Sequence, residues 1–314
     1  MFMRANQLMT EAARWREART LYEQAVSLDG EYAPAWAGLG QSRRVLAKYG
    51  GDSSSSLPLA QAAFARALAL DPDLSVAYEQ LAYVDVELGL AAEAMSRLID
   101  RVAERPRDPR LFAGLVTTCR YAGLLDASLA AHAKAVALDA AVRTTVCWTH
   151  FFLGDYAAAM RFDHGTPPFC SIQSQMFTGK PDPALLLEIE EQLSERGLRT
   201  AMRAYRLLQQ GQIEPALEGF KLMDESGFAD PEGWFLTAIG LARAGADAHA
   251  LTRIAKSVDA GFAAHRALVE RDHFDRLRGT AEFQGIVDRA RARVDHAKRL
   301  YERAGGPAIL GPAN

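Results

Sequence analysis

Residues 60–72 read AQAAFARALALDP, and four positions in this stretch recur along the chain at constant spacing. In most copies they are a small residue, a large and often aromatic residue, a second small residue and a Pro or Gly, at offsets of four, three and five. In residues 60–72 they are Ala60, Phe64, Ala67 and Pro72. Elsewhere they fall at Ala18, Tyr22, Ala25 and Gly30, at Ala94, Leu98, Arg101 and Pro106, and at Ser128, His132, Ala135 and Ala140. The steps from Ala60 to Ala94 and from Ala94 to Ser128 are both 34 residues.

A period of this length predicts stacked helical hairpins. Apolar residues recur at steps of three and four, as amphipathic helices require. Small residues let paired helices approach closely, aromatic residues fill the space between them, and Pro or Gly ends the second helix. Turn glycines are expected at Gly89, Gly123, Gly211 and Gly245. Because one hairpin cannot bury its apolar face alone, the sequence predicts an all-α solenoid of stacked hairpins.

The repeat resembles the tetratricopeptide repeat (TPR). Trp36, Leu39 and Gly40 match the opening of its pattern, and similar residues stand at Tyr78, Leu81 and Ala82, at Phe112 and Leu115, and at Trp234. The resemblance implies a right-handed TPR superhelix.

Several segments resemble the repeat region that follows the catalytic domain in bacterial TPR-containing serine/threonine kinases and adenylate cyclases. They are residues 2–8, 31–37, 111–115 and 152–156, with an ending similar to the terminal unit of such arrays at 260–262 and 277–283. The sequence lacks a Gly-rich phosphate loop, a His-Arg-Asp loop and an Asp-Phe-Gly motif. The resemblance therefore implies a sensory, scaffolding or regulatory array, and no enzymatic activity is predicted. Because the first repeat would begin just before Met1, we expect a segment excised or separated from a longer polypeptide.

Irregularities in the period predict the domain organisation. Residues 48–56 form a Ser- and Gly-rich insertion typical of a flexible turn. The pattern breaks at residues 163–170, where the pair Pro167 and Pro168 disfavours regular helix. We expect an N-terminal sub-array over 1–162, an irregular connection or bend over 163–182, a C-terminal sub-array with a capping helix over 183–304, and a flexible tail over 305–314.

The amino-acid composition further limits the partners and the cellular compartment that the sequence predicts. The formal net charge of −3 gives no long-range attraction for nucleic acid or anionic membrane, so neither is predicted as a partner. Three cysteines without regular spacing favour a reducing compartment, and no signal peptide or membrane span is evident, which favours the cytoplasm. No cofactor is predicted.

The first helix of each hairpin lines the concave groove of such arrays and predicts the binding residues. The candidates are Gln41, Arg44, Glu79, Tyr83, Arg110, Thr117, Arg120, Phe151 and Phe235. Arginine and aromatic residues are the types in which interface energy concentrates. The sequence thus predicts a protein- or peptide-binding scaffold that serves as a regulatory or sensory module of a bacterial signalling system. A linked or cognate kinase or cyclase domain is one candidate partner.

Three alternatives to the binding-scaffold interpretation remain open. A small-molecule sensor would have its pocket near residues 163–182. Cys147, His150, His164 and Cys170 have the residue types of a zinc site, although ordinary packing is favoured and no metal is predicted. His265 and His273, with Glu270, Asp272 and Asp275, have the residue types of acid–base catalysis, although a charged cap is favoured.

Overall fold

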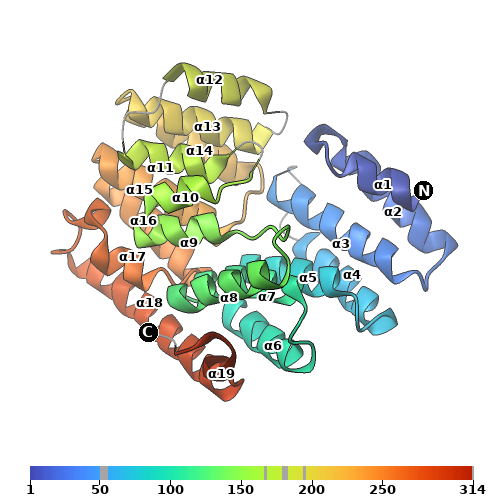
Figure 1. Ribbon diagram of the computed structural model, residues 1–314. Coiled ribbons are helices and arrows are strands. Elements are labelled where there is room, and N and C mark those ends of the chain that lie inside the picture. The colour runs from blue at the N-terminus through green and yellow to red at the C-terminus, as the bar shows by residue number, and fades with distance from the viewer. Residues whose placement is uncertain (50–55, 166–167, 179–182, 194–195, 313–314) are drawn as a thin grey trace. The chain divides into compact units, whose positions relative to one another are not determined.

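The computed structural model describes residues 1–49, 56–165, 168–178, 183–193 and 196–312, and these contain helices and connections without strands. Many consecutive helices lie side by side as antiparallel pairs (Figure 1). The longer helices are α2 (Trp15–Leu28), α3 (Ala33–Lys48), α4 (Ser56–Leu70), α5 (Ser75–Glu87), α6 (Ala91–Glu104), α7 (Pro109–Tyr121), α8 (Leu125–Leu138), α12 (Pro183–Gln192), α13 (Arg196–Gln209), α14 (Ile213–Glu225), α15 (Pro231–Ala244), α16 (Asp247–Asp259) and α18 (Ala281–Arg303). The predicted all-α class and the stacked helical hairpins are confirmed.

The chain divides into two compact units, and each unit combines two separate stretches of sequence. Unit 1 consists of Met1–Val84 and Pro183–Asp230, and unit 2 consists of Asp85–Asp182 and Pro231–Asn314. The predicted division into 1–162 and 183–304 follows the order of the sequence, whereas each compact unit takes part of both ranges. The two units are described separately below.

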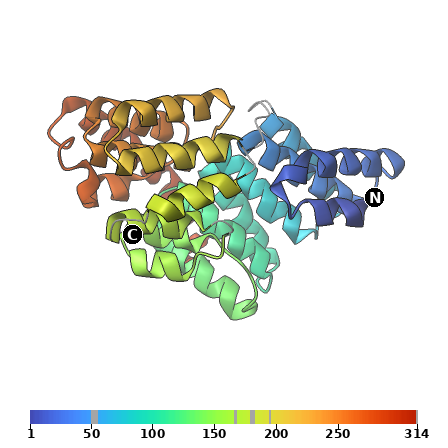
Figure 2. The same cartoon turned by 90° about the horizontal axis from the view of Figure 1, so that it is seen from above.

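Small residues and aromatic rings interlock in unit 1 as the repeat pattern predicts. Helix α1 (Phe2–Leu8) pairs with α2, and the blue N-terminal helices lie side by side in both views (Figures 1 and 2). A Cβ on Gly38 would collide with the ring of Tyr22, and a Cβ on Gly40 would lie 2.8 Å from the Phe64 ring. Glycine inside a helix costs about 1 kcal/mol relative to alanine. Here it lets α3 approach the aromatic residues of the helices before and after it.

The second stretch of unit 1 repeats this arrangement. The rings of Tyr205 on α13 and Phe220 on α14 meet edge to face, with centroids 5.3 Å apart. A Cβ on Gly219 would lie 2.9 Å from the Cβ of Ala204, so the small residues again mark the close approach of two helices. Arg206 on α13 pairs with Glu190 on α12 at 2.9 Å and joins that hairpin to the preceding helix.

Three turn glycines of unit 2 are each contacted by residues from the second stretch of that unit. Gly89, Gly123 and Gly154 have φ values of +81°, +80° and +79°, the left-handed region that glycine adopts without strain. A Cβ on Gly89 would lie 2.7 Å from the carbonyl oxygen of Ala260. A Cβ on Gly123 would collide with the carbonyl oxygen of Ala263, and one on Gly154 with the guanidinium of Arg271. Residues 260–271 therefore run along the turns of three successive hairpins.

The segment predicted as an irregular connection contains regular helix. Helix α9 (Val146–Leu153) and helix α10 (Tyr156–Arg161) precede residues 163–182, and helix α11 (Phe169–Thr178) lies within them. The carbonyl of Pro168 accepts a hydrogen bond from the Ile172 N–H, so this proline stands at the entrance of α11, where the missing N–H is not needed. Pro167 and residues 179–182 lie outside the described residues, as do residues 50–55 of the predicted Ser-rich turn.

The C-terminal end contains further helices. Helix α17 (His265–Glu270), the 3₁₀ turn η2 (Asp272–Phe274) and α18 are followed by α19 (Gly306–Leu310). The Tyr301 hydroxyl donates a hydrogen bond to the Gly311 carbonyl at 2.6 Å, and Leu310 is buried. Residues 306–310 of the predicted tail therefore form a short helix that contacts the end of α18 through an aromatic hydroxyl and a buried leucine.

Candidate functional site

Five side chains of α3 and α5 form one face of unit 1, called here the α3–α5 face: Gln41, Arg44, Lys48, Glu79 and Tyr83. Gln41, Arg44 and Lys48 follow one another at steps of three and four, which places them on the same side of α3. Of the four predicted groove residues in this unit, Glu79 is buried and the other three are half-buried.

The structure brings three of the predicted residues together on this face. The guanidinium carbon of Arg44 lies 4.9 Å from the centroid of the Tyr83 ring, within the range of a cation–π contact. The Tyr83 hydroxyl in turn donates a hydrogen bond to Glu79 Oε1 at 3.3 Å. Arg44 therefore bridges α3 and α5, and the aromatic ring beneath it is held by a carboxylate one turn away.

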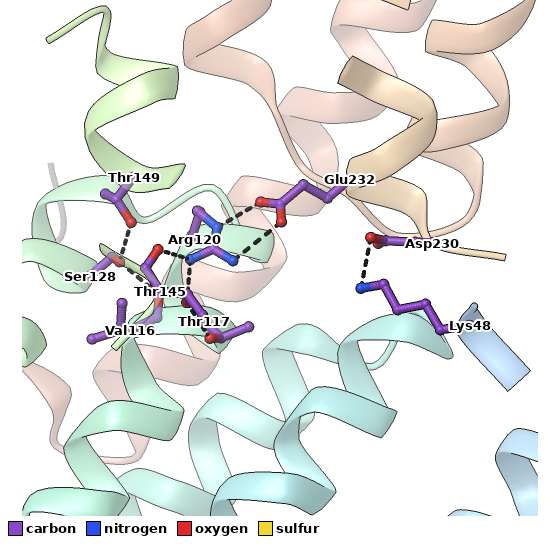
Figure 3. Close-up of polar contacts among 9 residues, drawn as sticks. All are labelled: Lys48, Val116, Thr117, Arg120, Ser128, Thr145, Thr149, Asp230 and Glu232. Carbon is purple, nitrogen blue, oxygen red and sulfur yellow. Dashed lines mark hydrogen bonds and ion pairs between the residues drawn. The ribbon is translucent and has the colours of Figure 1, made fainter. Parts of the chain in front are cut away.

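Lys48 extends this face by one helical turn and forms a nearly buried ion pair. Its Nζ lies 2.8 Å from Asp230 Oδ2, and the two side chains are 11% and 8% exposed (Figure 3). Nζ also lies 5.3 Å from the centroid of Tyr49. Sequence reasoning missed Lys48, although one more step of four from Arg44 reaches it. Asp230 gave no such signal, because it lies 182 residues further along the chain.

Unit 2 holds a second ion pair in its interior. Arg120 Nε donates to Glu232 Oε1 at 2.6 Å and Nη2 to Oε2 at 3.3 Å. Its Nη1 donates to the carbonyl and the hydroxyl of Thr145 at 3.0 and 2.8 Å (Figure 3). Burial by itself would lower the pKa of Arg120, but the adjacent Glu232 carboxylate raises it above its usual value, and the guanidinium stays charged.

Buried hydroxyl groups continue this network away from Arg120. The hydroxyls of Thr117 and Thr145 are 2.7 Å apart, and Ser128 donates to the carbonyl of Val116 at 2.7 Å (Figure 3). The hydroxyls of Ser128 and Thr149 are 2.8 Å apart. Because each of these polar groups has a partner, the interior of unit 2 accepts them at little cost.

Four predicted groove residues are therefore interior residues of unit 2. Thr117 and Arg120 belong to the buried polar network, and Phe151 and Phe235 are fully packed. The Phe235 ring, which was predicted to face a ligand, packs instead against the rings of Phe152 and Phe262, with centroids 5.8 and 5.4 Å away. None of these four side chains offers exposed surface to a ligand. Arg110 is exposed at the start of α7, where its backbone N–H donates to Asp108.

The cysteine and histidine residues weighed as a zinc site do not gather around one point. No group of three or more potential metal ligands occurs in the part of the chain that the structure describes. Cys119, Cys147 and Cys170 are buried free thiols. Burial raises the pKa of Cys119 to about 12, and burial together with a hydrogen bond to Cys147 raises that of Cys170. The His150 ring stacks on Phe162 with centroids 5.4 Å apart.

His273 is held inside unit 2 as a packing residue. Its side chain is 5% exposed, and Nε2 lies 3.1 Å from the Tyr156 hydroxyl. The ring centroid is 4.6 Å from that of Phe177. Burial lowers the pKa of His273 to about 4, and the nearby Asp272 offsets only part of this shift. Among the described residues, the His273 imidazole is therefore a neutral packing group held by Tyr156 and Phe177.

Unit 2 contains small hollows. One, of about 60 Å³, is lined by Ala92, Glu93, Gly261, Arg293 and His296, among others. Another, of about 10 Å³, lies among Arg120, Phe152, Phe262 and Arg266. A third, open to solvent, is lined by residues 105–109. None of these is lined by residues 163–182, so none of them supports the predicted sensor pocket.

No helix among the described residues is both long enough and apolar enough to cross a membrane.

Comparison with known proteins gives a likeness of fold. No family model matches the sequence, and no curated protein is significantly similar to it. Among solved structures, the human IFIT1 dimer with m7Gppp-AAAA is 18% identical with a TM-score of 0.42, and the alignment covers 94% of this chain and 68% of that one. The human IFIT1 dimer with PPP-AAAA gives 18% and 0.41, with 95% and 69% covered. A monomeric IFIT1 mutant with Gppp-AAAA gives 16% and 0.43, with 93% and 67% covered.

These structures correct the prediction that nucleic acid is excluded as a partner. Helical-repeat proteins with a likeness to this chain are seen with the ligands Gppp-AAAA, m7Gppp-AAAA and PPP-AAAA. The prediction rested on the net charge of the whole chain, whereas contact with phosphate depends on local arginine and lysine residues. A net charge of −3 therefore does not exclude this class of ligand.

The fold and the α3–α5 face define the class of protein: an all-α protein of TPR-like helical hairpins, with a cationic and aromatic face on the first helices of two successive hairpins.

Proposed function

We propose that this protein is a binding scaffold that holds a protein or peptide partner against the α3–α5 face. The contact of Arg44 with the Tyr83 ring, at 4.9 Å, carries the proposal. It joins two helices and presents an arginine and a tyrosine together, the residue types that dominate binding energy at protein interfaces.

The packing of this face favours binding. A half-buried side chain that is already held by a neighbour loses little conformational entropy when a ligand arrives. Arg44 is held by Tyr83, and Tyr83 is held by Glu79 through the 3.3 Å hydrogen bond. The face therefore combines surface that a ligand can cover with side chains whose geometry is fixed in advance.

The proposal of a regulatory or scaffolding role in bacterial signalling rests on the sequence resemblance. Similarity to the repeat region of bacterial TPR-containing kinases and cyclases supports a regulatory or scaffolding module in the bacterial cytoplasm, without a catalytic step of its own. A covalently linked or cognate kinase or cyclase domain is then a candidate partner.

Selection from two ligand pools tests the proposal. The purified chain is presented with a displayed library of random peptides and, separately, with a pool of single-stranded RNA. Enriched peptides should bind the wild type and bind the Arg44→Ala/Tyr83→Ala variant at least about 30-fold more weakly, as expected when a contact worth about 2 kcal/mol is removed. Arg299→Ala, at an exposed position of α18, serves as the matched control and should bind like the wild type.

Two outcomes would overturn the proposal. One is enrichment in the RNA pool alone. The other is peptide binding that the double variant retains in full while circular dichroism shows it to be folded.

A further inference from the structure

We infer that Cys147 and Cys170 form an oxidation site, in which a peroxide converts the two buried thiols to a disulfide that links α9 to α11. The juxtaposition that carries the inference is the hydrogen bond between the two thiol side chains in the interior of unit 2. The pair belongs to unit 2, so the inference does not depend on the binding function proposed for the α3–α5 face of unit 1.

The packing of α9 against α11 holds the two cysteines together. Cys147 lies in the first turn of α9, and Cys170 lies in the first turn of α11. One turn after Cys147, the ring of Phe151 meets the ring of Phe177, which lies two turns after Cys170, with centroids 5.4 Å apart. Phe177 also stacks on Tyr156 of α10 at 5.2 Å. The two helices are therefore fixed side by side at two levels, with their first turns together.

The surroundings of the two thiols differ and assign them different roles. The attacking species in thiol oxidation is the thiolate, which a neighbouring cation favours. The guanidinium of Arg120 interacts electrostatically with Cys147, which is 6% exposed, whereas Cys170 is 1% exposed. Burial, the contact with Cys147 and the carboxylates of Asp163 and Glu232 raise the pKa of Cys170. Cys147 is therefore the sulfur that meets the peroxide, and Cys170 is the thiol that closes the disulfide.

The reaction balances with one peroxide for each pair of thiols. The sulfur of Cys147 bonds to one peroxide oxygen and the O–O bond breaks, which gives a sulfenic acid, while the departing hydroxide takes up the thiol proton as water. The sulfur of Cys170 then bonds to the sulfenic sulfur and the S–O bond breaks. The leaving hydroxyl group carries away the Cys170 proton as a second water. Two electrons have passed from the two sulfur atoms to the peroxide.

The charges around the pair favour an uncharged product. Asp163 lies before α11, where its Oδ2 accepts the Ser171 N–H at 2.7 Å, and Glu232 is held by Arg120. Soft cations such as Cu(I) bind sulfur as thiolate, so a metal at this place would bury further negative charge near two carboxylates. A disulfide carries no charge. The pair is therefore suited to oxidation and not to metal binding.

Peptide mapping of the oxidised wild type tests the inference without any variant. The reduced, folded chain is treated with hydrogen peroxide, denatured, alkylated with iodoacetamide and digested with trypsin in the absence of reductant. The sequence places Cys147 on the tryptic peptide 144–161, Cys170 on 162–196 and Cys119 on 111–120. The first two peptides should appear joined and lighter by two hydrogen atoms, and a reductant should separate them. Peptide 111–120 should be alkylated.

Thermal unfolding tests whether the link forms in the folded chain. A disulfide that fits the native packing restricts the unfolded chain, so the oxidised protein should melt about 3 °C or more above the reduced protein. The matched control is Cys119→Ala, which removes a buried thiol outside the pair and should leave the yield of joined peptides unchanged.

Single-cysteine variants and a sulfenic acid trap test the two roles. Dimedone, a carbon nucleophile that labels sulfenic acids, should label Cys147 in Cys170→Ala and should leave Cys170 unlabelled in Cys147→Ala. Labelling in the reverse order would overturn the assignment of roles.

Three outcomes would overturn the oxidation site itself. They are separate alkylated peptides after peroxide treatment, a disulfide that involves Cys119, and a melting temperature that falls on oxidation. The proposed binding function fails separately, since it depends on whether selected peptides need Arg44 and Tyr83.

Discussion

Arg120 and Glu232 are 112 residues apart in the sequence and form a two-point ion pair in the interior of unit 2. The pair joins α7 to the beginning of α15, so two distant stretches of sequence share one buried charge network. Arg120 also donates two hydrogen bonds to Thr145, which leaves its guanidinium well satisfied although the side chain is only 2% exposed.

Breaking this pair from one side should destabilise the protein strongly. Glu232→Gln or Arg120→Met leaves a buried charge without its partner, and we expect a loss of about 3–5 kcal/mol in the free energy of unfolding. Urea denaturation measures this loss. The exposed pair of Arg266 and Asp126, at 3.3 Å, is the matched control, and Asp126→Asn should cost about 0–1 kcal/mol. Equal effects at the two sites would show that the buried network does not hold unit 2 together.

Acid should weaken the packing around His273. The pKa of about 4 in the folded protein lies below the ordinary value of about 6.5, so the unfolded chain binds the proton more readily. The contribution of neutral His273 to the free energy of unfolding is fully present above about pH 6.5 and is lost as the pH falls toward 4. The full loss is about 3 kcal/mol. Chemical denaturation at several pH values should show that the free energy of unfolding falls less steeply with decreasing pH in His273→Gln than in the wild type. An equally steep fall would contradict the lowered pKa of His273.

Two turn glycines of unit 2 should respond differently to alanine. Gly89 and Gly245 have φ values of +81° and +88°, so Ala carries a conformational cost of about 1–2 kcal/mol at either position. At Gly89 the new Cβ would also lie 2.7 Å from the Ala260 carbonyl oxygen, whereas at Gly245 the nearest atom is 3.8 Å away. Thermal unfolding should therefore show a larger loss for Gly89→Ala. Equal losses would mean that residues 260–261 move aside without cost.

The three thiols should be protected in the folded protein. Cys119, Cys147 and Cys170 are buried. Burial raises the pKa of Cys119 to about 12 and also raises that of Cys170, so these two groups carry very little thiolate at neutral pH. A thiol-specific chromogenic disulfide reagent should react slowly with the native chain and with all three groups in denaturant. Rapid stoichiometric reaction of one thiol under native conditions would contradict this burial.

The hairpin repeat was predictable because its determinants are local. The collision of a Gly38 Cβ with Tyr22, and the approach of Gly40 to Phe64, are contacts between neighbouring helices in the sequence, and their spacing of small and aromatic residues is visible without a structure. The left-handed turns at Gly89 and Gly123 follow from the same period.

The residues of the candidate site could be predicted only where the residues that contact them belong to neighbouring repeats in the sequence. Arg44 and Tyr83 lie on neighbouring first helices, and the repeat register brings them together. Arg120 and Phe235 were predicted for the same groove but are buried. Arg120 pairs with Glu232, 112 positions away, and Phe235 packs on Phe152, 83 positions away, and the repeat gives no signal for either contact. Lys48 required knowledge of Asp230 before its role could be recognised.

The contacts of residues 260–271 with the turns at Gly89, Gly123 and Gly154 also bear on synthesis of the chain. Ala260 leaves the ribosome 171 residues after Gly89, which at 5–20 residues per second is a delay on the order of 10–30 s. During that interval the first stretch of unit 2 has uncovered turns and an unpaired Arg120. Nascent chains halted before residue 260 should therefore be more sensitive to protease in residues 85–162 than chains released at full length.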